Sequence, residues 1–335
     1  MNDFRNNLLS DKIVCALINA TESYTKMDVL LNEFSSTQSA LSDFLLSLDV
    51  YYNFFYTKPD ILQICINLYI RDQSSDTTGI VDVISKCTKY ANNKAQTTDV
   101  LTAIDLFRID RAISTVSTAP LMEDGSSIVP EYNIEAVWTI LHNIYGPQRQ
   151  YPILLETSIA IYKLCLFSSE YCFNIQTLII FLSILYKSKF AFQGLHRQWT
   201  LSTDPRLDFN TMADEDAIIH VLSVFQQMWE HSATLIRSIN YKRDEISKLI
   251  RIEPFRQLSA GFSELLAENV CIRNQDVTEK LCISSKTAIK NLKQLEQEQI
   301  LIAAKKGREI FYFNNLFLDL LKQSIEVSDY GTKKP

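Results

Sequence analysis

The stretch "VTEKLCISSKTAIKNLKQLEQEQILIAAKKGREIFYF", residues 277–313, is the most informative part of this 335-residue chain. Its apolar spacing predicts a short helix over 274–281, a turn, and a longer helix from about 285 to 299. Two strands, 300–304 and 309–313, follow around a turn rich in lysine, glycine and arginine. A helix over 254–270 precedes this stretch and another begins at 314. Three helices followed by a two-stranded wing describe a winged helix-turn-helix.

The helix from 285 places apolar and basic side chains on different sides. At about 100° per residue, four apolar residues cluster on one side: Ala288, Ile289, Leu292 and Leu295. Three lysines cluster roughly opposite: Lys286, Lys290 and Lys293. Ser284 is placed to cap the helix, which would leave the first amide groups facing an anion.

The charge distribution indicates a local site for a polyanion. Residues 284–308 hold six basic and two acidic residues, a net charge of +4. Since the whole chain has a net charge of −6, the remaining residues carry a net charge of −10. The first turn of a recognition helix enters the major groove, and a wing reaches the adjacent backbone. We therefore predict double-stranded DNA as the partner, contacted by Ser284, Ser285, Lys286, Thr287, Lys290, Lys293, Lys305, Lys306 and Arg308.

Two other interpretations of these residues stay open. Lysines at helical spacing are common on a helix face that only meets water. Winged helices also serve as docking modules for other proteins, which would make the chain an adaptor. Lysine and serine position phosphate as readily as they read base edges, so the stretch predicts no particular DNA sequence.

Composition favours a mainly α-helical fold without a metal or cofactor. Only 7 glycines and 8 prolines supply tight turns, and 47% of the residues are hydrophobic. The seven cysteines and four histidines show no zinc spacing, and we expect the cysteines to be reduced and buried. The start of the chain lacks the pattern of a signal peptide, and no apolar run reaches the length of a membrane span.

The chain divides by its pattern into three regions. We predict an N-terminal helical region over 1–129, a helical core over 130–250 and the winged helix-turn-helix domain over 251–335. Within the core, a helix ends at Gly146, and a very long helix capped by Asp214 runs to about 250.

The C-terminal stretch also resembles the winged-helix tail of many bacterial Fic-family proteins. The segments "YPILLETSIAIYKLCLFSSEYCFNIQTLIIFLSILYKSKF", 151–190, and "DEDAIIHVLSVFQQMWEHSATLIRSI", 214–239, are similar in layout to the Fic core and its following helix. The resemblance covers about 130–322. It implies a multi-helix Fic-like bundle ahead of the DNA-binding domain.

The segment that corresponds to the Fic catalytic loop departs from the family. Fic proteins transfer a nucleotidyl group with a loop in which a histidine acts as base and glycines let backbone amides hold phosphates. Here the loop reads "LFSSEYCFNIQ", 166–176, with Phe167 about where the base should stand. It holds no histidine, glycine or arginine. The resemblance therefore implies a Fic-like scaffold without Fic chemistry and without catalytic residues.

These observations together predict a non-enzymatic DNA-binding protein of a bacterium or a mobile genetic element. We expect a cytoplasmic, nucleoid-associated homodimer that binds DNA and regulates transcription, with repression as the favoured direction. The acidic helical body would mediate dimerisation or contact a protein partner. The alternatives are a divergent nucleotidyl (AMP) transferase and a protein–protein adaptor.

Overall fold

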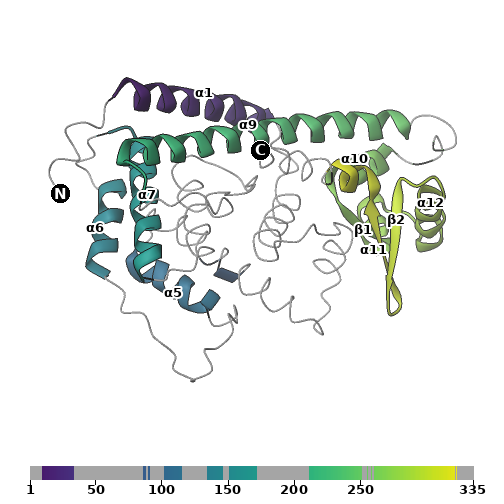
Figure 1. Cartoon of the computed structure of the whole chain (residues 1–335). Helices are drawn as coiled ribbons and strands as arrows, with labels where there is room; N and C mark the ends of the chain where they lie inside the picture. The colour runs from purple at the N-terminus through teal and green to yellow at the C-terminus, as the bar shows by residue number, and fades with distance from the viewer. Residues whose placement is uncertain are drawn as a thin grey trace. The chain divides into compact units, whose positions relative to one another are not determined.

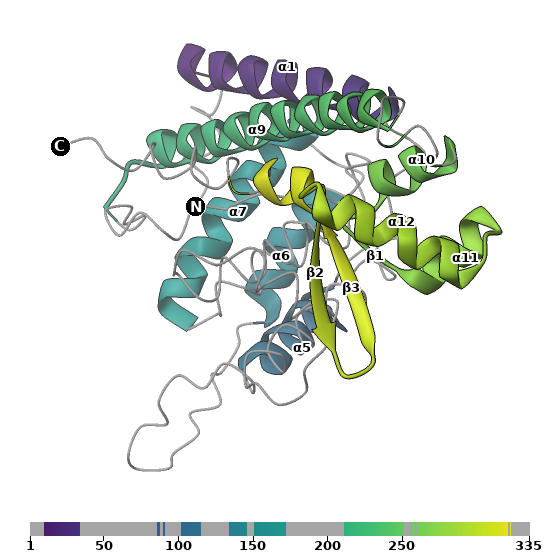
Figure 2. The same ribbon diagram turned by 90° about the vertical axis from the view of Figure 1, so that its right-hand side faces the viewer.

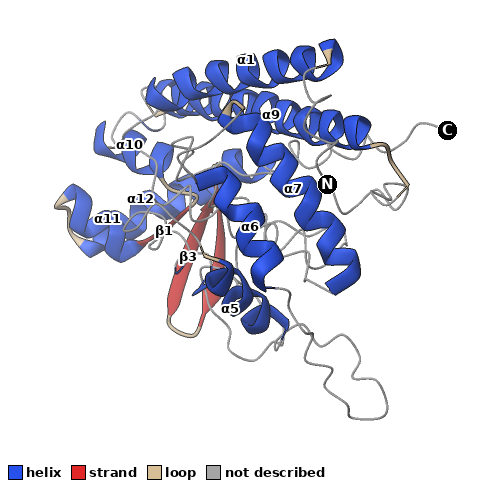
Figure 3. Cartoon of the chain, turned by 90° about the vertical axis from the view of Figure 1, so that its left-hand side faces the viewer, coloured by secondary structure: helices blue, strands red, loops and turns tan. Residues whose placement is uncertain are grey.

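The computed structural model is mainly helical, with one small antiparallel sheet (Figure 1; Figure 3). The chain forms two compact units, the first from 1–29 and 75–232, the second from 30–74 and 233–335. The structure describes residues 10–33, 86–87, 90, 102–114, 134–145, 151–171, 211–250, 255, 258, 260–320 and 322. In these segments no helix is long and apolar enough to cross a membrane.

The first unit contains helices only, within the part that the structure describes. These are α5 (Ala103–Ser114), α6 (Ile134–Tyr145), α7 (Ile153–Tyr171), most of α1 (Asp11–Glu33) and the first half of α9 (Asp214–Leu249). Helix α6 ends directly before Gly146, as the sequence predicted. The residues predicted as a boundary loop, 122–130, and the apolar segment 177–186 lie outside the described residues.

Helices α1 and α9 run parallel in this unit. The Ser10 hydroxyl donates to Glu215 over 2.6 Å, and the Ser23 hydroxyl donates to Glu230 over 3.1 Å, so residue numbers rise together along both helices. Between them the fully buried ring of Trp229 on α9 packs edge-on against the ring of Tyr24 on α1. Burial of this aromatic side chain stabilises the pairing of the two helices.

Two details of this unit correct the sequence prediction. Helix α9 has the predicted length, but Asp214 lies in its first turn rather than at the cap. Its carboxylate accepts a 2.6 Å hydrogen bond from Tyr162, and burial together with this bond raises the pKa of Tyr162. Residues 166–171, predicted as loop, belong to α7 because no glycine or proline stops that helix.

The described part of the second unit is built around a three-stranded sheet. After the second half of α9, its elements follow in the order α10 (Ala260–Glu268), β1 (Cys271–Arg273), α11 (Asn274–Leu281), α12 (Ser285–Gln297), β2 (Leu301–Lys306) and β3 (Glu309–Asn314). The limits of α11 are those predicted. Strands β2 and β3 pair antiparallel, as predicted. The sequence did not predict β1, which pairs antiparallel with the other side of β3 and extends the sheet to three strands. Helix α10 is also shorter than the predicted 254–270.

The register of β3 explains why it is central. Phe313 stands opposite Cys271 on one side and Ile302 on the other, and Phe311 stands opposite Arg273 and Ala304. The last four residues of β3 are buried, whereas its first two are exposed. The sheet therefore belongs to the core at one end, and the β2–β3 hairpin extends into solvent at the other (Figure 2).

Candidate nucleic-acid interface

Helix α12 begins at a side-chain cap, as predicted. The Ser284 hydroxyl accepts a hydrogen bond from the backbone N–H of Thr287 over 3.2 Å, and the two hydroxyl groups lie 2.8 Å apart. Such a cap satisfies one of the four N–H groups that a helix start leaves without a partner. The remaining amide groups of the first turn are at an exposed surface, where an anion is favoured by the helix dipole.

The two faces of α12 differ sharply. Ala288, Leu292 and Leu295 are fully buried, which confirms the predicted core face. Lys286, Lys290 and Lys293 are exposed on the opposite side. Among the described residues none of these three lysines makes an ion pair. Because like charges at i, i+3 and i, i+4 destabilise a helix slightly, this unneutralised row costs stability that an anionic partner would restore.

Ile289 was predicted wrongly. The sequence placed it with the core residues, but its side chain is 40% exposed. It lies about 100° around the helix from Ala288, beyond the sector that the core covers. An apolar side chain therefore stands on the solvent-facing surface, next to the lysines.

The turn between α11 and α12 is fixed by backbone and side chain together. Cys282 ends α11 in the left-handed conformation, with φ of 52°. The Asn274 side-chain amide then donates to the Ser285 hydroxyl over 2.7 Å, linking the starts of the two helices. Ser285 thus positions α12 against α11. Its oxygen is the acceptor in this bond, so its own hydroxyl hydrogen stays available to a second partner.

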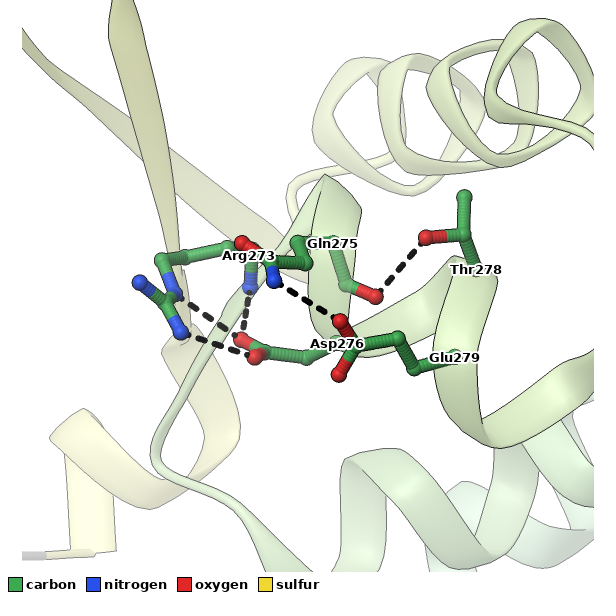
Figure 4. Close-up of polar contacts among 5 residues, drawn as sticks. All are labelled: Arg273, Gln275, Asp276, Thr278 and Glu279. Carbon is green, nitrogen blue, oxygen red and sulfur yellow. Dashed lines mark hydrogen bonds and ion pairs between the residues drawn. The ribbon is translucent and has the colours of Figure 1, made fainter.

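A capping box holds the start of α11 (Figure 4). The backbone N–H of Arg273 donates to the Asp276 carboxylate over 2.7 Å, and the Arg273 guanidinium contacts the same carboxylate at 3.1 and 3.3 Å. This contact raises the pKa of Arg273. Within the helix, Gln275 donates to Glu279 and the Thr278 hydroxyl donates to the Gln275 carbonyl.

This box was missed at the sequence level, although it carries a readable signal. An acidic residue at the third position of a helix is typical of a capping box, and Asp276 holds that position in α11. Arginine is an unusual residue at a helix N-cap, so the sequence did not indicate a capping box at this position. The Arg273 side chain therefore forms an ion pair with Asp276 at the start of α11, whereas the three lysines of α12 form none with the described residues.

The tip of the β2–β3 hairpin is also basic. Lys305 pairs across the strands with Ile310, and Gly307 takes a positive φ of 58° at the first of the two turn residues. This φ suits glycine in a two-residue hairpin turn. Lys305 and Arg308 are exposed, and Ile310 is 38% exposed. The side chain of Lys306 lies outside the described residues.

Every predicted contact residue falls in the second unit, on two of its elements or directly beside them. Ser284, Ser285, Lys286, Thr287, Lys290 and Lys293 lie at or on α12, and Lys305, Lys306 and Arg308 lie at the end of the hairpin. The structure therefore groups the predicted cations into one row on α12 and one group at the hairpin tip. The acidic residue of α12 is Glu296, in its last turn, and Glu298 follows as the C-cap residue.

The described cysteines are arranged differently from the prediction. Cys15 and Cys282 are exposed, whereas Cys87 is buried. Burial, with a smaller contribution from Asp276, raises the pKa of the Cys271 thiol to about 12. In the described segments, no three His, Cys, Asp or Glu side chains are arranged to hold a metal ion.

No protein-family model matches the sequence, and no curated protein is similar to it. A function for this chain therefore follows from its own residues and geometry.

Proposed function

We propose that residues 260–322 form a winged helix-turn-helix that binds double-stranded DNA and regulates transcription. The order helix, strand, helix, helix, strand, strand supports this fold, since α11 and α12 supply the helix-turn-helix and β2–β3 the wing. The observation that carries the proposal is the exposed row Lys286, Lys290 and Lys293, opposite the buried face of α12.

In the proposed complex the start of α12 enters the major groove. Ser284, Lys286 and Thr287 would then face the groove, while the later lysines reach phosphates along its wall. Lys305 and Arg308 at the wing tip would contact the neighbouring backbone. The capping box at Arg273 and the Asn274–Ser285 bond support this docking, because they hold α11 and α12 in one rigid arrangement.

The number of cations supports two copies on one site. Five exposed basic side chains on one α12 and wing give modest, salt-dependent affinity. Two heads on a two-fold symmetric site double the phosphate contacts, so we propose a homodimer that acts as a repressor at the nucleoid. The acidic remainder of the chain would repel DNA and thereby confine it to the basic surface.

For the helical body we propose a Fic-like scaffold that performs no nucleotidyl transfer. The motif residues are missing from 166–176, and residues 166–171 continue α7, where helix hydrogen bonds occupy the backbone amides. Such amides cannot cradle a phosphate. We assign dimerisation or contact with a protein partner to this part of the chain.

Charge reversal on α12 tests the proposed function. We expect Lys286→Glu/Lys290→Glu/Lys293→Glu to abolish retention of a labelled random-sequence duplex pool at moderate salt in a gel-shift assay. The matched control is Lys12→Glu/Lys26→Glu/Arg111→Glu, which lowers the net charge by the same amount on exposed residues of the first unit. It should bind like the wild type. Equal binding by both variants would contradict the proposal.

A second candidate, protein docking, is favoured by one observation. Ile289 and Ile310 expose apolar surface beside the cations, as a protein-binding surface would. Under that alternative the wild-type chain itself would not retain the duplex. Nucleotidyl transfer is tested separately with labelled ATP and magnesium, and transfer of label to protein would refute the scaffold assignment.

A further inference from the structure

The surface of α12 that faces solvent is not wholly polar. Ile289 exposes 40% of its side chain there, one turn into the helix. Lys286 precedes it by three residues and Lys293 follows it by four, so both lysines are its neighbours on the helix surface. The isoleucine therefore lies beside exposed cations, at a position close to the start of the helix.

An isoleucine at this position does not serve phosphate binding. It carries no donor or charge, it is a poorer helix former than lysine or glutamine, and its exposure to water is unfavourable. A polar residue would suit a solvated or phosphate-binding face better. The side chain gains free energy only where a partner offers it an apolar group.

A DNA duplex offers one such group in the major groove. The C5-methyl of thymine is the apolar feature of the base-pair edges there, and isoleucine is of a size to cover it. Phosphates along the wall of the same groove would meet the later lysines, Lys290 and Lys293. Charge and apolar surface on α12 are thus both complementary to a groove segment that contains thymine.

We propose that Ile289 is a specificity-determining residue that contacts the C5-methyl group of a thymine in the bound DNA. This inference rests on the proposed function, because it requires α12 to lie in the major groove. It adds a sequence preference that the lysines do not provide. Each half-site of the target contains a thymine where Ile289 meets the base edges.

The structure supplies a matched control in Ile310. This second isoleucine is 38% exposed and lies beside Lys305 on the hairpin. It has the same chemistry and nearly the same exposure, but its element reaches the DNA backbone in the proposed complex. The thymine methyl is confined to the major groove, so Ile310 makes no contact with it.

The test begins with the full-length protein and a target duplex selected from a random pool. Each thymine of the selected site is then replaced singly by deoxyuridine, which removes only the methyl group. At one thymine per half-site we expect about fourfold weaker binding by the wild type, the value for losing one buried methyl contact. Ile289→Ala should bind the thymine and deoxyuridine duplexes equally well, while Ile310→Ala should keep the fourfold difference.

The outcomes separate this inference from the proposed function. Binding to the selected site without sensitivity to deoxyuridine at any position would overturn the role of Ile289 and leave DNA binding standing. A fourfold difference that persists in Ile289→Ala would do the same. Failure of the wild type to bind any duplex would overturn both. Thermal unfolding of both variants should match the wild type, since each side chain is exposed.

Discussion

Replacing Asn314 by alanine should destabilise the second unit, because it removes the hydrogen bonds of one buried side chain. Asn314 is the last residue of β3 and is 1% exposed. Its side-chain amide donates to the carbonyl of Leu266 over 2.8 Å, and its side-chain oxygen accepts from the N–H of Leu316 over 3.2 Å. The Leu266 carbonyl lies in the last turn of α10, where a helix leaves its carbonyls without internal partners.

The cost of Asn314→Ala follows from these bonds. An unsatisfied buried carbonyl costs about 1–3 kcal/mol, and loss of a capping side chain costs about 1 kcal/mol. The total is about 3 kcal/mol. The neighbouring Asn315 provides the control, because its amide also donates to a backbone carbonyl, that of Gln299, but at an exposed site. Asn315→Ala should cost no more than about 1 kcal/mol.

Hydrogen exchange read by mass spectrometry measures this difference locally. The three tryptophans of the chain, Trp138, Trp199 and Trp229, all precede residue 233, so fluorescence would not report on the second unit. Amides of α10 and β3 should exchange on the order of 100-fold faster in Asn314→Ala. Equal acceleration in the two variants would refute the reasoning, since it would mean that the buried bond has no special value.

Three further predictions concern the neighbouring elements. Asp276→Ala removes the hydrogen bond to the Arg273 backbone N–H and the partly exposed ion pair with the Arg273 guanidinium. This change should lower the stability of α11 by about 1–2 kcal/mol, measured as faster hydrogen exchange of the α11 amides. Unchanged exchange would argue against the capping box. The pKa of the Cys271 thiol is raised to about 12, so its thiolate is scarce at pH 8. Iodoacetamide should therefore label the exposed Cys282 first, and Cys271 only as the pH approaches 12. Equal labelling of the two cysteines at pH 8 would contradict this prediction. Gly307→Ala should cost about 1 kcal/mol through its positive φ alone, since no atom lies within 4 Å of the added methyl group, and Gly307→Asn should cost less in the same exchange measurement.

The C-terminal half was predictable where local signals decide the structure. Helix α11, the Ser284 cap and the pairing of two strands around Gly307 follow from apolar periodicity, capping chemistry and turn residues within a few positions of each other. The lysine face of α12 follows in the same way, because it depends only on the helical repeat.

Features that depend on distant parts of the chain were missed. Strand β1 has three residues and too little alternation to be recognised, and it exists because β3, about 40 residues later, supplies its hydrogen bonds. Phe255 and Leu258 are buried but lie outside α10, so their helical spacing did not mark a continuous helix. The exposure of Ile289 depends on where the core ends, which periodicity alone does not define.

The salt dependence of duplex binding tests the central claim most directly. We expect the logarithm of the association constant of the wild type to fall steeply and linearly with the logarithm of salt concentration. Changing Lys286, Lys290 and Lys293 to glutamine should reduce this slope by about 3 for each bound head, at about 0.9 per lost phosphate contact. A flat wild-type slope, or an identical slope in the variant, would contradict contact between these lysines and DNA.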